Sequence, residues 1–275
     1  MKVAFNTFDP RHCARRWVCY LDILGFSELV ESGDIVSAVH TYFRSRELVE
    51  WWARRNPAMG LACFSDSYIL YADNDSAGRF ARIEQAARWI VNEHLQMGLP
   101  IRGALACGEL YADAQSDIFI GNALIEAYRF GEAQDWLGFA LCRSATRRMA
   151  AVGLPPCQRL NYRRWKIPWS KKKKSKSGAR PLYAYAIGVS STSRGKNQHL
   201  DALREMAQRA KTRRVKQMYR NAIRFLEHFG ILQPVPAGGN GRTGAGAARA
   251  SRRRSAAKSP PPTPRLTASS MTSTA

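Results

Sequence analysis

The feature that most restricts the fold of this chain is a change of hydrophobic period along its first half. Residues 17–26 form a nearly unbroken apolar run rich in strand-forming residues, which predicts a buried strand that breaks at Gly25. In residues 34–52 the apolar side chains recur at helical spacing, and Asp34 stands where a helix N-cap is expected. A strand followed by a helix is therefore the first structural unit.

The alternation continues to residue 142. Short apolar runs at 61–64 and 68–71 flank the turn-forming residues 65–67, which predicts a tight hairpin. The remaining predicted elements are a helix over 77–97, a strand over 100–108, a helix over 121–130 and a strand over 136–142. This order is βαββαβ with one extra helix and strand, and it predicts a ferredoxin-like α+β fold, an antiparallel sheet backed by helices.

Positive charge dominates the second half of the chain. The formal net charge is +22 while residues 1–162 are close to neutral, so the basicity is a property of the C-terminal part. Residues 163–180 hold nine basic and no acidic residues, which predicts a basic loop before a strand over 181–189. Further on, an apolar stripe under a basic face predicts a C-terminal helix, or a hairpin of two helices, that ends at Gly230.

These patterns divide the chain into three expected parts. Residues 1–192 are expected to form the main domain, and residues 198–230 a basic helical segment. Residues 234–275 consist mostly of Ala, Gly, Ser, Thr, Pro and Arg, which cannot bury enough apolar surface to offset the entropy of ordering. We therefore expect a disordered basic tail.

Composition excludes several classes of protein. With 45% hydrophobic residues the chain is not globally disordered, and no apolar run approaches the 18 or so residues that a membrane span needs. The N-terminus has no signal-peptide pattern, so a cytoplasmic protein is expected. The six cysteines lack CxxC spacing, and we interpret them as buried thiols.

Two carboxylates stand at positions where chemistry is expected. Asp22 is near the end of the first strand and Asp66 is in the hairpin turn, so both can meet at one edge of the sheet. There they can hold two oxygen-loving cations over a triphosphate, and the turn at Gly25, which opens a helix, suits phosphate. The alternative is that each aspartate is an ordinary turn or cap residue.

These segments resemble the class III nucleotidyl cyclases, homodimers that convert a nucleoside triphosphate into a 3′,5′-cyclic monophosphate and pyrophosphate. Residues 20–26 (YLDILGF) resemble the family's opening F-x-D-I-x-G-F, and Ser65-Asp66 resembles its Gly-Asp hairpin. Residues 102–108 (RGALACG) and 121–130 resemble its R-x-G-I-x-x-G strand and its G-x-x-V-N-x-A-x-R-L helix. The resemblance covers about residues 15–143 and implies the class III cyclase fold.

The resemblance also implies roles for individual residues. Asp22, Asp66 and the carbonyl of Ile23 would bind two Mg²⁺ or Mn²⁺ ions, and backbone amides around Gly25 and Phe26 would cradle the phosphates.

A further role falls to the last of the four segments. Arg129 would reach in from the second protomer and stabilise charge that develops on the transferred phosphorus. The alternative for Arg129 is a solvated helix arginine. The family's late lysine would correspond to Lys176, for which a solvated lysine-rich loop is the alternative.

Departures from the family bear on the base that is bound. The lysine and aspartate that read purines are replaced by Ala62 and Ile118, and the ribose asparagine by Ile125. A subgroup with this combination is similar in four segments, F-S-D-S at 64–67, R-G-A at 102–104, G-x-A-L-I-E-A-Y at 121–128 and D-W at 135–136. It comprises the pyrimidine cyclases of bacterial Pycsar antiphage systems.

That similarity implies conversion of UTP to cyclic UMP, or of CTP to cyclic CMP, as a messenger sensed by a downstream effector during phage infection. Candidate base-reading residues are Tyr42, Ser65, Arg102 and Asp117. Arg102 has an alternative role, pairing with a carboxylate across the sheet.

Two other functions remain open at this point. The basic residues after position 162 would suit a nucleic-acid-binding module, although that reading gives Asp22 and Asp66 no role. The departures at Ile125 and at the late lysine would suit a degenerate cyclase fold that binds nucleotide without turnover.

Overall fold

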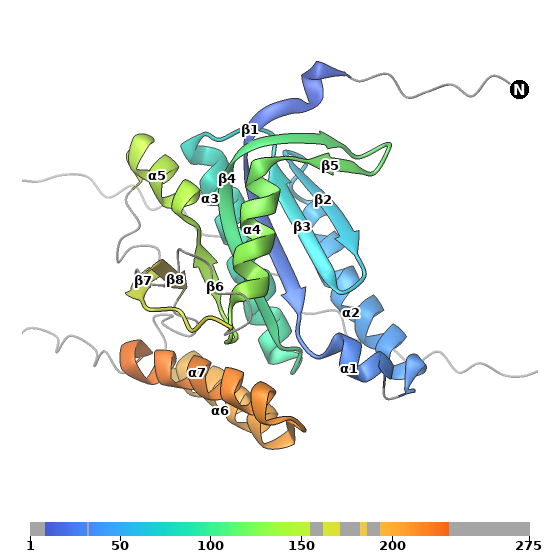
Figure 1. The fold of residues 1–275 in the computed structure, drawn as a ribbon, viewed down its shortest axis with the longest axis vertical. Coiled ribbons are helices and arrows are strands. Elements are labelled where there is room, and N and C mark those ends of the chain that lie inside the picture. The colour runs from blue at the N-terminus through green and yellow to red at the C-terminus, as the bar shows by residue number, and fades with distance from the viewer. Residues whose placement is uncertain (1–8, 32, 155–161, 171–181, 186–192, 231–275) are drawn as a thin grey trace, which may run out of the picture. The chain divides into compact units, whose positions relative to one another are not determined.

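An eight-stranded sheet forms the centre of the computed structural model, which describes residues 9–31, 33–154, 162–170, 182–185 and 193–230 (Figure 1). The strands lie in the order β2-β3-β1-β4-β6-β8-β7, and β5 pairs with β4. Every pairing is antiparallel except that of β4 with β6. The strands are β1 (Cys13–Ile23), β2 (Met59–Phe64), β3 (Ser67–Ala72), β4 (Ile101–Asp113), β5 (Ile118–Ile120), β6 (Phe139–Leu141), β7 (Tyr162–Trp165) and β8 (Leu182–Tyr185).

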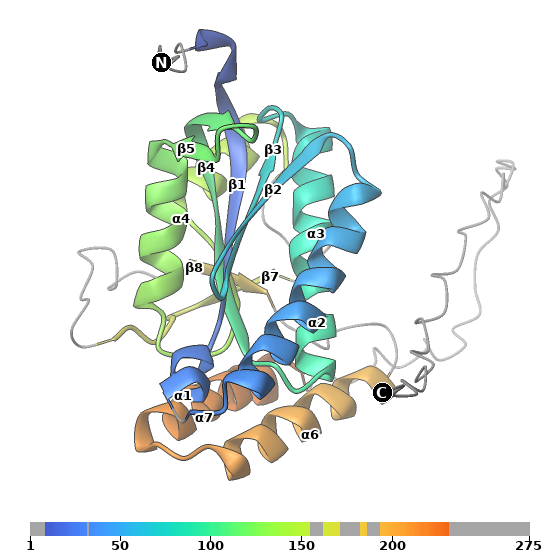
Figure 2. The ribbon, with the colours of Figure 1, turned by 90° about the vertical axis from the view of Figure 1, so that its right-hand side faces the viewer.

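Helices cover both faces of this sheet. Figure 2 shows α4 on one face and α2 and α3 on the other. The helices are the 3-10 turn η1 (Pro10–His12), α1 (Phe26–Glu31), α2 (Ile35–Arg54), α3 (Ala77–Gln96), α4 (Asn122–Ala133), α5 (Arg143–Ala151), α6 (Ser193–Arg209) and α7 (Arg213–Gly230). The α+β arrangement predicted from the sequence is confirmed.

The central strand β1 organises the core. It pairs with β3 on one side and with β4 on the other, and from Trp17 to Ile23 every residue is buried. The bounds predicted for this strand, 17–26, lie a few residues too far along the chain, since β1 runs from Cys13 to Ile23. Gly25 has a φ of 80°, which takes the backbone out of the extended conformation.

The predicted hairpin and the three long helices of the first half are confirmed to within a few residues. Ser65 and Asp66 form the turn between β2 and β3, and Ser65 has a positive φ of 52°. The Asp34 side chain accepts a hydrogen bond from the Ser37 amide, as expected of the N-cap of α2.

Other predicted boundaries were wrong. The strand expected over 100–108 is β4, which continues to Asp113. Its last residues pair with β5 in an antiparallel hairpin. The strand expected over 136–142 is reduced to the three residues of β6. Helix α5 was not predicted, because it is only nine residues long and strongly charged.

The predicted basic loop over 163–180 is partly wrong as well. Residues 162–165 form β7, in which Tyr162 is buried and Trp165 packs its ring against Phe225. Aromatic side chains within the basic run give this segment a buried side despite its charge. Residues 171–181 and most of the predicted 181–189 strand lie outside the described residues.

The basic segment at 198–230 is a hairpin of two helices, α6 and α7, and α7 ends at Gly230 as predicted. Thr212 separates the two helices and accepts a hydrogen bond from the Val215 amide at 3.2 Å. The hairpin shares the main hydrophobic core, since Phe225 contacts the Trp136 ring edge-on at 4.9 Å between centroids. Residues 1–233 accordingly form one compact unit.

Several smaller expectations can be compared with the described residues. Cys19, Cys107 and Cys142 are buried as expected, whereas Cys13 is exposed and Cys63 is half-buried; Cys157 lies outside the described residues. In the described part of the chain, no helix has the length and hydropathy that crossing a membrane requires. The predicted disordered tail, residues 234–275, also lies outside the described residues.

Candidate active site

The end of β1 and the β2–β3 turn bring the two predicted metal ligands together. Asp22 is paired in register with Ser67, the residue that follows Asp66. The Ile23 amide donates a hydrogen bond to the Asp66 carbonyl at 3.0 Å, which fixes the turn against the end of β1. Asp22, Ile23 and Asp66 therefore lie at one edge of the sheet, as the sequence predicted.

Asp22 is held by side chains on both neighbouring strands. Asp22 is buried, with only 6% of its surface exposed. Arg102 on β4 donates from Nε to Asp22 Oδ2 at 3.0 Å, and its Nη2 forms an ion pair with the same oxygen at 2.9 Å. The Ser67 hydroxyl on β3 donates to Asp22 Oδ1 at 3.3 Å. One carboxylate oxygen thus faces a guanidinium and the other has a single weak partner.

Arg102 is itself fixed by the C-terminal end of α4. Its Nη1 donates to the carbonyls of Glu132 and Gln134 at 3.3 and 3.0 Å, and its Nη2 donates to Glu132 Oε1 at 2.6 Å. Pairing with a carboxylate across the sheet, the alternative considered for Arg102, is what the structure shows. Every nitrogen of its guanidinium has a protein partner in this arrangement, so none is free to read a base.

The electrostatics of this cluster favour a bound cation. Burial, above all, raises the pKa of Asp22 to about 6; the negative charges of Glu132 and Asp66 raise it further, while Arg102 opposes the shift. Arg102 pairs with Asp22 and Glu132, and the charge of Asp66 also acts on Asp22, so three carboxylates and one guanidinium leave an excess of negative charge. Divalent cations with a preference for oxygen would relieve it, so the residues present fit Mg²⁺ or Mn²⁺.

The candidate metal site differs from a dedicated metal cage. Among the described residues there is no group of three or more His, Cys, Asp or Glu side chains arranged to hold an ion. Asp22 and Asp66 with a backbone carbonyl would therefore need further oxygen ligands from water or a phosphate, as Mg²⁺ sites in nucleotide enzymes usually do.

Next to the aspartates lie the residues predicted to bind the nucleotide. A Cβ at Gly25 would meet no atom within 4 Å, so this turn is open as well as left-handed. Phe26 and Tyr42 are in contact, with ring centroids 6.3 Å apart, which places Tyr42 beside the turn. Ser65 is exposed on the hairpin turn, and Asp117 lies apart from these residues in the β4–β5 turn with a φ of 54°.

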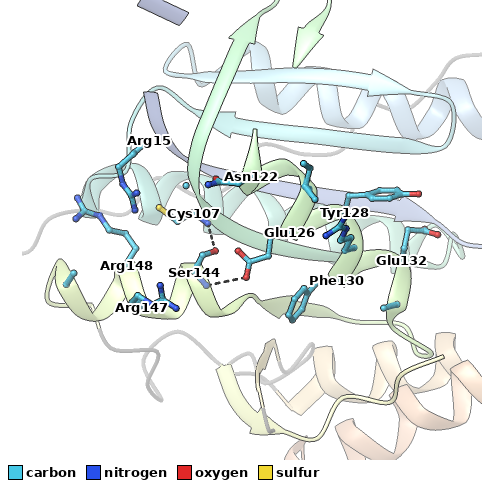
Figure 3. Close-up of a pocket in the computed structure, with 15 residues that line it drawn as sticks. Arg15, Cys107, Asn122, Glu126, Tyr128, Phe130, Glu132, Ser144, Arg147 and Arg148 are labelled. Atoms are coloured by element: carbon cyan, nitrogen blue, oxygen red, sulfur yellow. Dashed lines mark hydrogen bonds between the residues drawn. The ribbon is translucent and has the colours of Figure 1, made fainter. Parts of the chain in front are cut away.

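Arg129 lies on the exposed side of α4 and lines an open cavity of about 1160 Å³ between α4 and α5. Figure 3 shows Glu126 and Tyr128 of α4 and Ser144 of α5 among the residues that line this cavity. Asp22 and Asp66 are not among the residues that line this cavity. Within one chain, the structure thus brings the two aspartates together and leaves Arg129 on another surface. Lys176, the counterpart of the family's late lysine, lies outside the described residues.

Sequence reasoning missed three residues of this site. Ser67 was visible in the F-S-D-S segment but had no assigned role, although its hydroxyl contacts Asp22. Glu132 and Gln134 follow Arg129 at the end of α4, and no sequence pattern links them to Arg102, some 30 residues earlier. Their role depends on how α4 packs against β4.

Comparison with known proteins adds a likeness of fold. No model of a protein family matches the sequence, and no curated protein matches it. The adenylyl cyclase CyaB from P. aeruginosa is 16% identical over 63% of this chain and 93% of its own, with a TM-score of 0.44. A bacterial light-regulated adenylyl cyclase is 11% identical over 78% of this chain and 58% of its own, with a TM-score of 0.45.

A third similar structure is the guanylate cyclase domain of RhGC from Catenaria anguillulae in complex with GTP. It is 13% identical over 62% of this chain and 94% of its own, with a TM-score of 0.40. Identities this low say nothing about the activity of this chain, which rests on its own residues.

Proposed function

We propose that this protein is a nucleotidyl cyclase that converts UTP into 3′,5′-cyclic UMP and pyrophosphate. The observation that carries the proposal is the convergence of Asp22 and Asp66, which the Ile23–Asp66 backbone hydrogen bond fixes at the edge of the sheet beside the open Gly25 turn. Ordinary turn or cap residues would not need to lie together with an excess of buried negative charge.

The side chains divide the chemistry between them. Asp22, Asp66 and the Ile23 carbonyl would hold two Mg²⁺ or Mn²⁺ ions, which when bound supply Lewis acidity at the ribose 3′-hydroxyl and at the phosphates. The amides around Gly25 and Phe26 orient the triphosphate so that the 3′-oxygen faces the α-phosphorus. The 3′-hydroxyl gives up its proton to solvent water, its oxygen forms the new bond to that phosphorus, the bond from phosphorus to the bridging oxygen of the β-phosphate breaks, and pyrophosphate leaves.

Arg129 would complete the site of a second protomer in a head-to-tail homodimer with two shared active sites. Its exposure on α4 suits a role at an interface. Large apolar side chains are also exposed on the same helix, on β5 and at the β2–β3 turn: Phe64, Ile118, Ile120, Ile125 and Tyr128. Such side chains are costly to leave in water and favour a second copy of the chain as their cover.

The preference for a pyrimidine rests on what the site lacks. Ala62 on β2 and Ile118 on β5 cannot donate or accept the side-chain hydrogen bonds that read a purine. Tyr42 contacts Phe26 beside the Gly25 turn and Ser65 is exposed on the hairpin turn, and we propose that these two side chains contact the base. CTP conversion to cyclic CMP is the alternative, and production of either messenger for an effector in antiphage defence is part of the proposal.

The direct test is to incubate the purified protein with each of the four ribonucleoside triphosphates and Mn²⁺ and to identify the products by mass. Cyclic UMP as the main product is expected. Cyclic CMP would reassign the substrate, and a purine product would refute the interpretation of Ala62 and Ile118. If no triphosphate yields a product, the cyclase proposal fails.

Variants of the two aspartates test the site itself. Asp22→Asn and Asp66→Asn each remove a charged metal ligand while keeping the size of the side chain, and we expect turnover to fall by at least about 100-fold. Asp201→Asn, an exposed aspartate on α6, is the matched control and should retain full activity. Equal activity in all three variants would contradict the assignment.

One observation favours a second candidate function, a nucleotide-binding protein without turnover. The guanidinium of Arg102 occupies Asp22 Oδ2, and a cation that needs this oxygen must share it. Tight nucleotide binding by a protein that yields no cyclic product with Mn²⁺ or Mg²⁺ would establish this alternative.

A further inference from the structure

The C-terminal helix α7 closes one side of the sheet edge at which the candidate active site lies. Its first turns pack beside the end of β1 and the start of β4, where they enclose a second cavity of about 180 Å³. The cavity is lined by Leu24, Gly25, Pro100, Arg102, Leu137, Arg214, Val215, Met218 and Tyr219. The cavity therefore lies between the Gly25 turn, which is predicted to bind phosphate, and α7, a helix outside the segments that resemble cyclases.

The charged groups of this cavity are two guanidinium groups, and Tyr219 adds a hydroxyl. Arg102 is nine-tenths buried and fixed by Asp22 and by the end of α4. Arg214 is different, since its side chain is 63% exposed and its contact with Asp135, from Nε to Oδ1, is 3.5 Å long. A pair this long and this exposed holds a side chain weakly, so Arg214 is free to turn toward a ligand.

Helix α7 is held in place by buried contacts, although the Arg214 side chain that it carries is exposed. The Asn221 amide group donates to the Asp135 carbonyl at 2.8 Å, and Met218 and Tyr219 are buried. A rigid helix thus presents a mobile guanidinium at the mouth of a small cavity. The docked helix therefore places the positive charge of Arg214 near the cavity, while the guanidinium itself can adjust its orientation to a ligand.

The chemistry of the lining points to phosphate. Guanidinium groups bind phosphate oxygens through two parallel hydrogen bonds, and a glycine turn lets phosphate approach the backbone closely. An engineered cavity of about 150 Å³ holds one benzene molecule, so a cavity of this size accommodates one or two phosphate groups but not a whole nucleotide. The neighbouring Asp22 and Gly25 place it beside the proposed triphosphate site.

We infer that Arg214 is a phosphate-binding residue that contacts the terminal phosphates of the nucleotide bound in its own protomer. The inference rests on the proposed function for the identity of the ligand. It gives the C-terminal hairpin α6–α7 a part in the active site, since α7 then carries a substrate-binding side chain.

The experiment measures binding of inorganic pyrophosphate, with Mg²⁺ present, to the full-length protein by titration calorimetry. Arg214→Ala is expected to weaken binding about tenfold, as the loss of a charge-assisted hydrogen-bond pair does. Arg214→Lys keeps the charge without the planar guanidinium, so its affinity for pyrophosphate should lie between those of wild type and Arg214→Ala. Arg213→Ala is the matched control, because it removes the same charge from the adjacent exposed residue, which does not line the cavity.

The same variants are then assayed for turnover of UTP. Arg214→Ala should raise KM about tenfold with a smaller change in kcat, whereas Arg213→Ala should leave both unchanged. Circular dichroism and the denaturation midpoint show whether each variant is folded. If Arg214→Ala loses its fold, Arg214→Lys supplies the comparison.

The outcomes separate this inference from the proposed function. Absence of pyrophosphate binding, or equal weakening by Arg213→Ala and Arg214→Ala, overturns the inference. If Arg214→Ala forms the cyclic nucleotide with the KM and kcat of wild type, the inference about Arg214 is overturned and the proposed function stands. Binding of pyrophosphate that depends on Arg214, in a protein that makes no cyclic nucleotide, would support the inference and overturn the proposed function.

Discussion

Arg102 and Asp22 lie opposite each other on β4 and β1, and their pairing carries much of the local stability of the site. Arg102→Ala would remove the guanidinium that pairs with the buried Asp22 carboxylate, and with it the ion pair to the partly exposed Glu132. Removal of one partner from a buried ion pair typically costs about 3–5 kcal/mol in the free energy of unfolding, and we expect a loss in this range in denaturant titrations without divalent cations.

Two further measurements make that prediction specific. Arg204→Ala removes an exposed arginine that pairs with Glu227, and it should change the free energy of unfolding by less than about 1 kcal/mol. Addition of Mn²⁺ should recover part of the loss in Arg102→Ala, because the cation replaces the missing positive charge. A loss of similar size in both variants would refute the role given to Arg102.

His94 is predicted to make stability depend on pH. It is fully buried on α3 between the Ser45 hydroxyl and the Ile90 carbonyl, and burial lowers its pKa to about 4. Between the unfolded pKa of about 6.5 and the folded value, the unfolded chain binds more protons than the folded one, so stability falls as the pH drops through this window. The loss is roughly 3 kcal/mol when complete.

The measurement compares wild type with His94→Gln in urea titrations at several values of pH from 7 to 4. The difference between the two proteins isolates His94 from Asp22, whose raised pKa acts in the opposite direction. His228→Gln, an exposed histidine on α7, is the control and should follow the wild type. A difference that does not vary with pH would show that His94 does not titrate in this range.

At the scale of elements, the turn that follows β1 depends on one glycine. Gly25 has a φ of 80°, and an alanine there would pay about 1–2 kcal/mol for the left-handed conformation although nothing blocks its Cβ. Gly78→Ala is a matched control, since Gly78 lies in α3 with nothing within 4 Å of a Cβ, and alanine should stabilise that helix by about 0.8–1 kcal/mol. Thermal unfolding of both variants is the test; shifts of the same sign would contradict it.

The hairpin α6–α7 is expected to unfold together with the sheet. Phe225 is 2% exposed and contacts the rings of Trp136 and Trp165, so Phe225→Ala should lower the free energy of unfolding by about 3–5 kcal/mol. Because the hairpin shares the main core, fluorescence and circular dichroism should report one coincident transition. An early separate transition in the variant would show that the hairpin is an independent appendage.

At the scale of the whole molecule, the proposed homodimer predicts complementation between inactive variants. Asp66→Ala and Arg129→Ala should each be inactive, because each removes one half of every shared site. When the two are mixed and allowed to exchange subunits, half of the dimers are mixed and have one intact site, so about a quarter of wild-type activity should return. No recovery after verified exchange would place Arg129 in the same protomer's site or in none.

The order of the elements was largely predictable from the sequence. The helices α2, α3 and α4 and the β2–β3 hairpin follow from hydrophobic period and from turn chemistry at Ser65 and Asp66, which act between near neighbours in the chain. The placement of both aspartates at one sheet edge followed from that order. Short elements such as α5, β5 and β7 were missed, because a few residues carry too little periodic pattern.

Only the tertiary structure decided what those residues contact. Arg102 meets Asp22 across 80 residues of sequence and meets Glu132 through the packing of α4, because strand register and helix docking set these contacts. The position of α7 beside Gly25 has the same cause, since its aromatic side chains pack on Trp136 and on Trp165 of β7. By itself, the sequence determined which chemical groups and local elements the chain has; the packing of distant elements determined which of those groups meet.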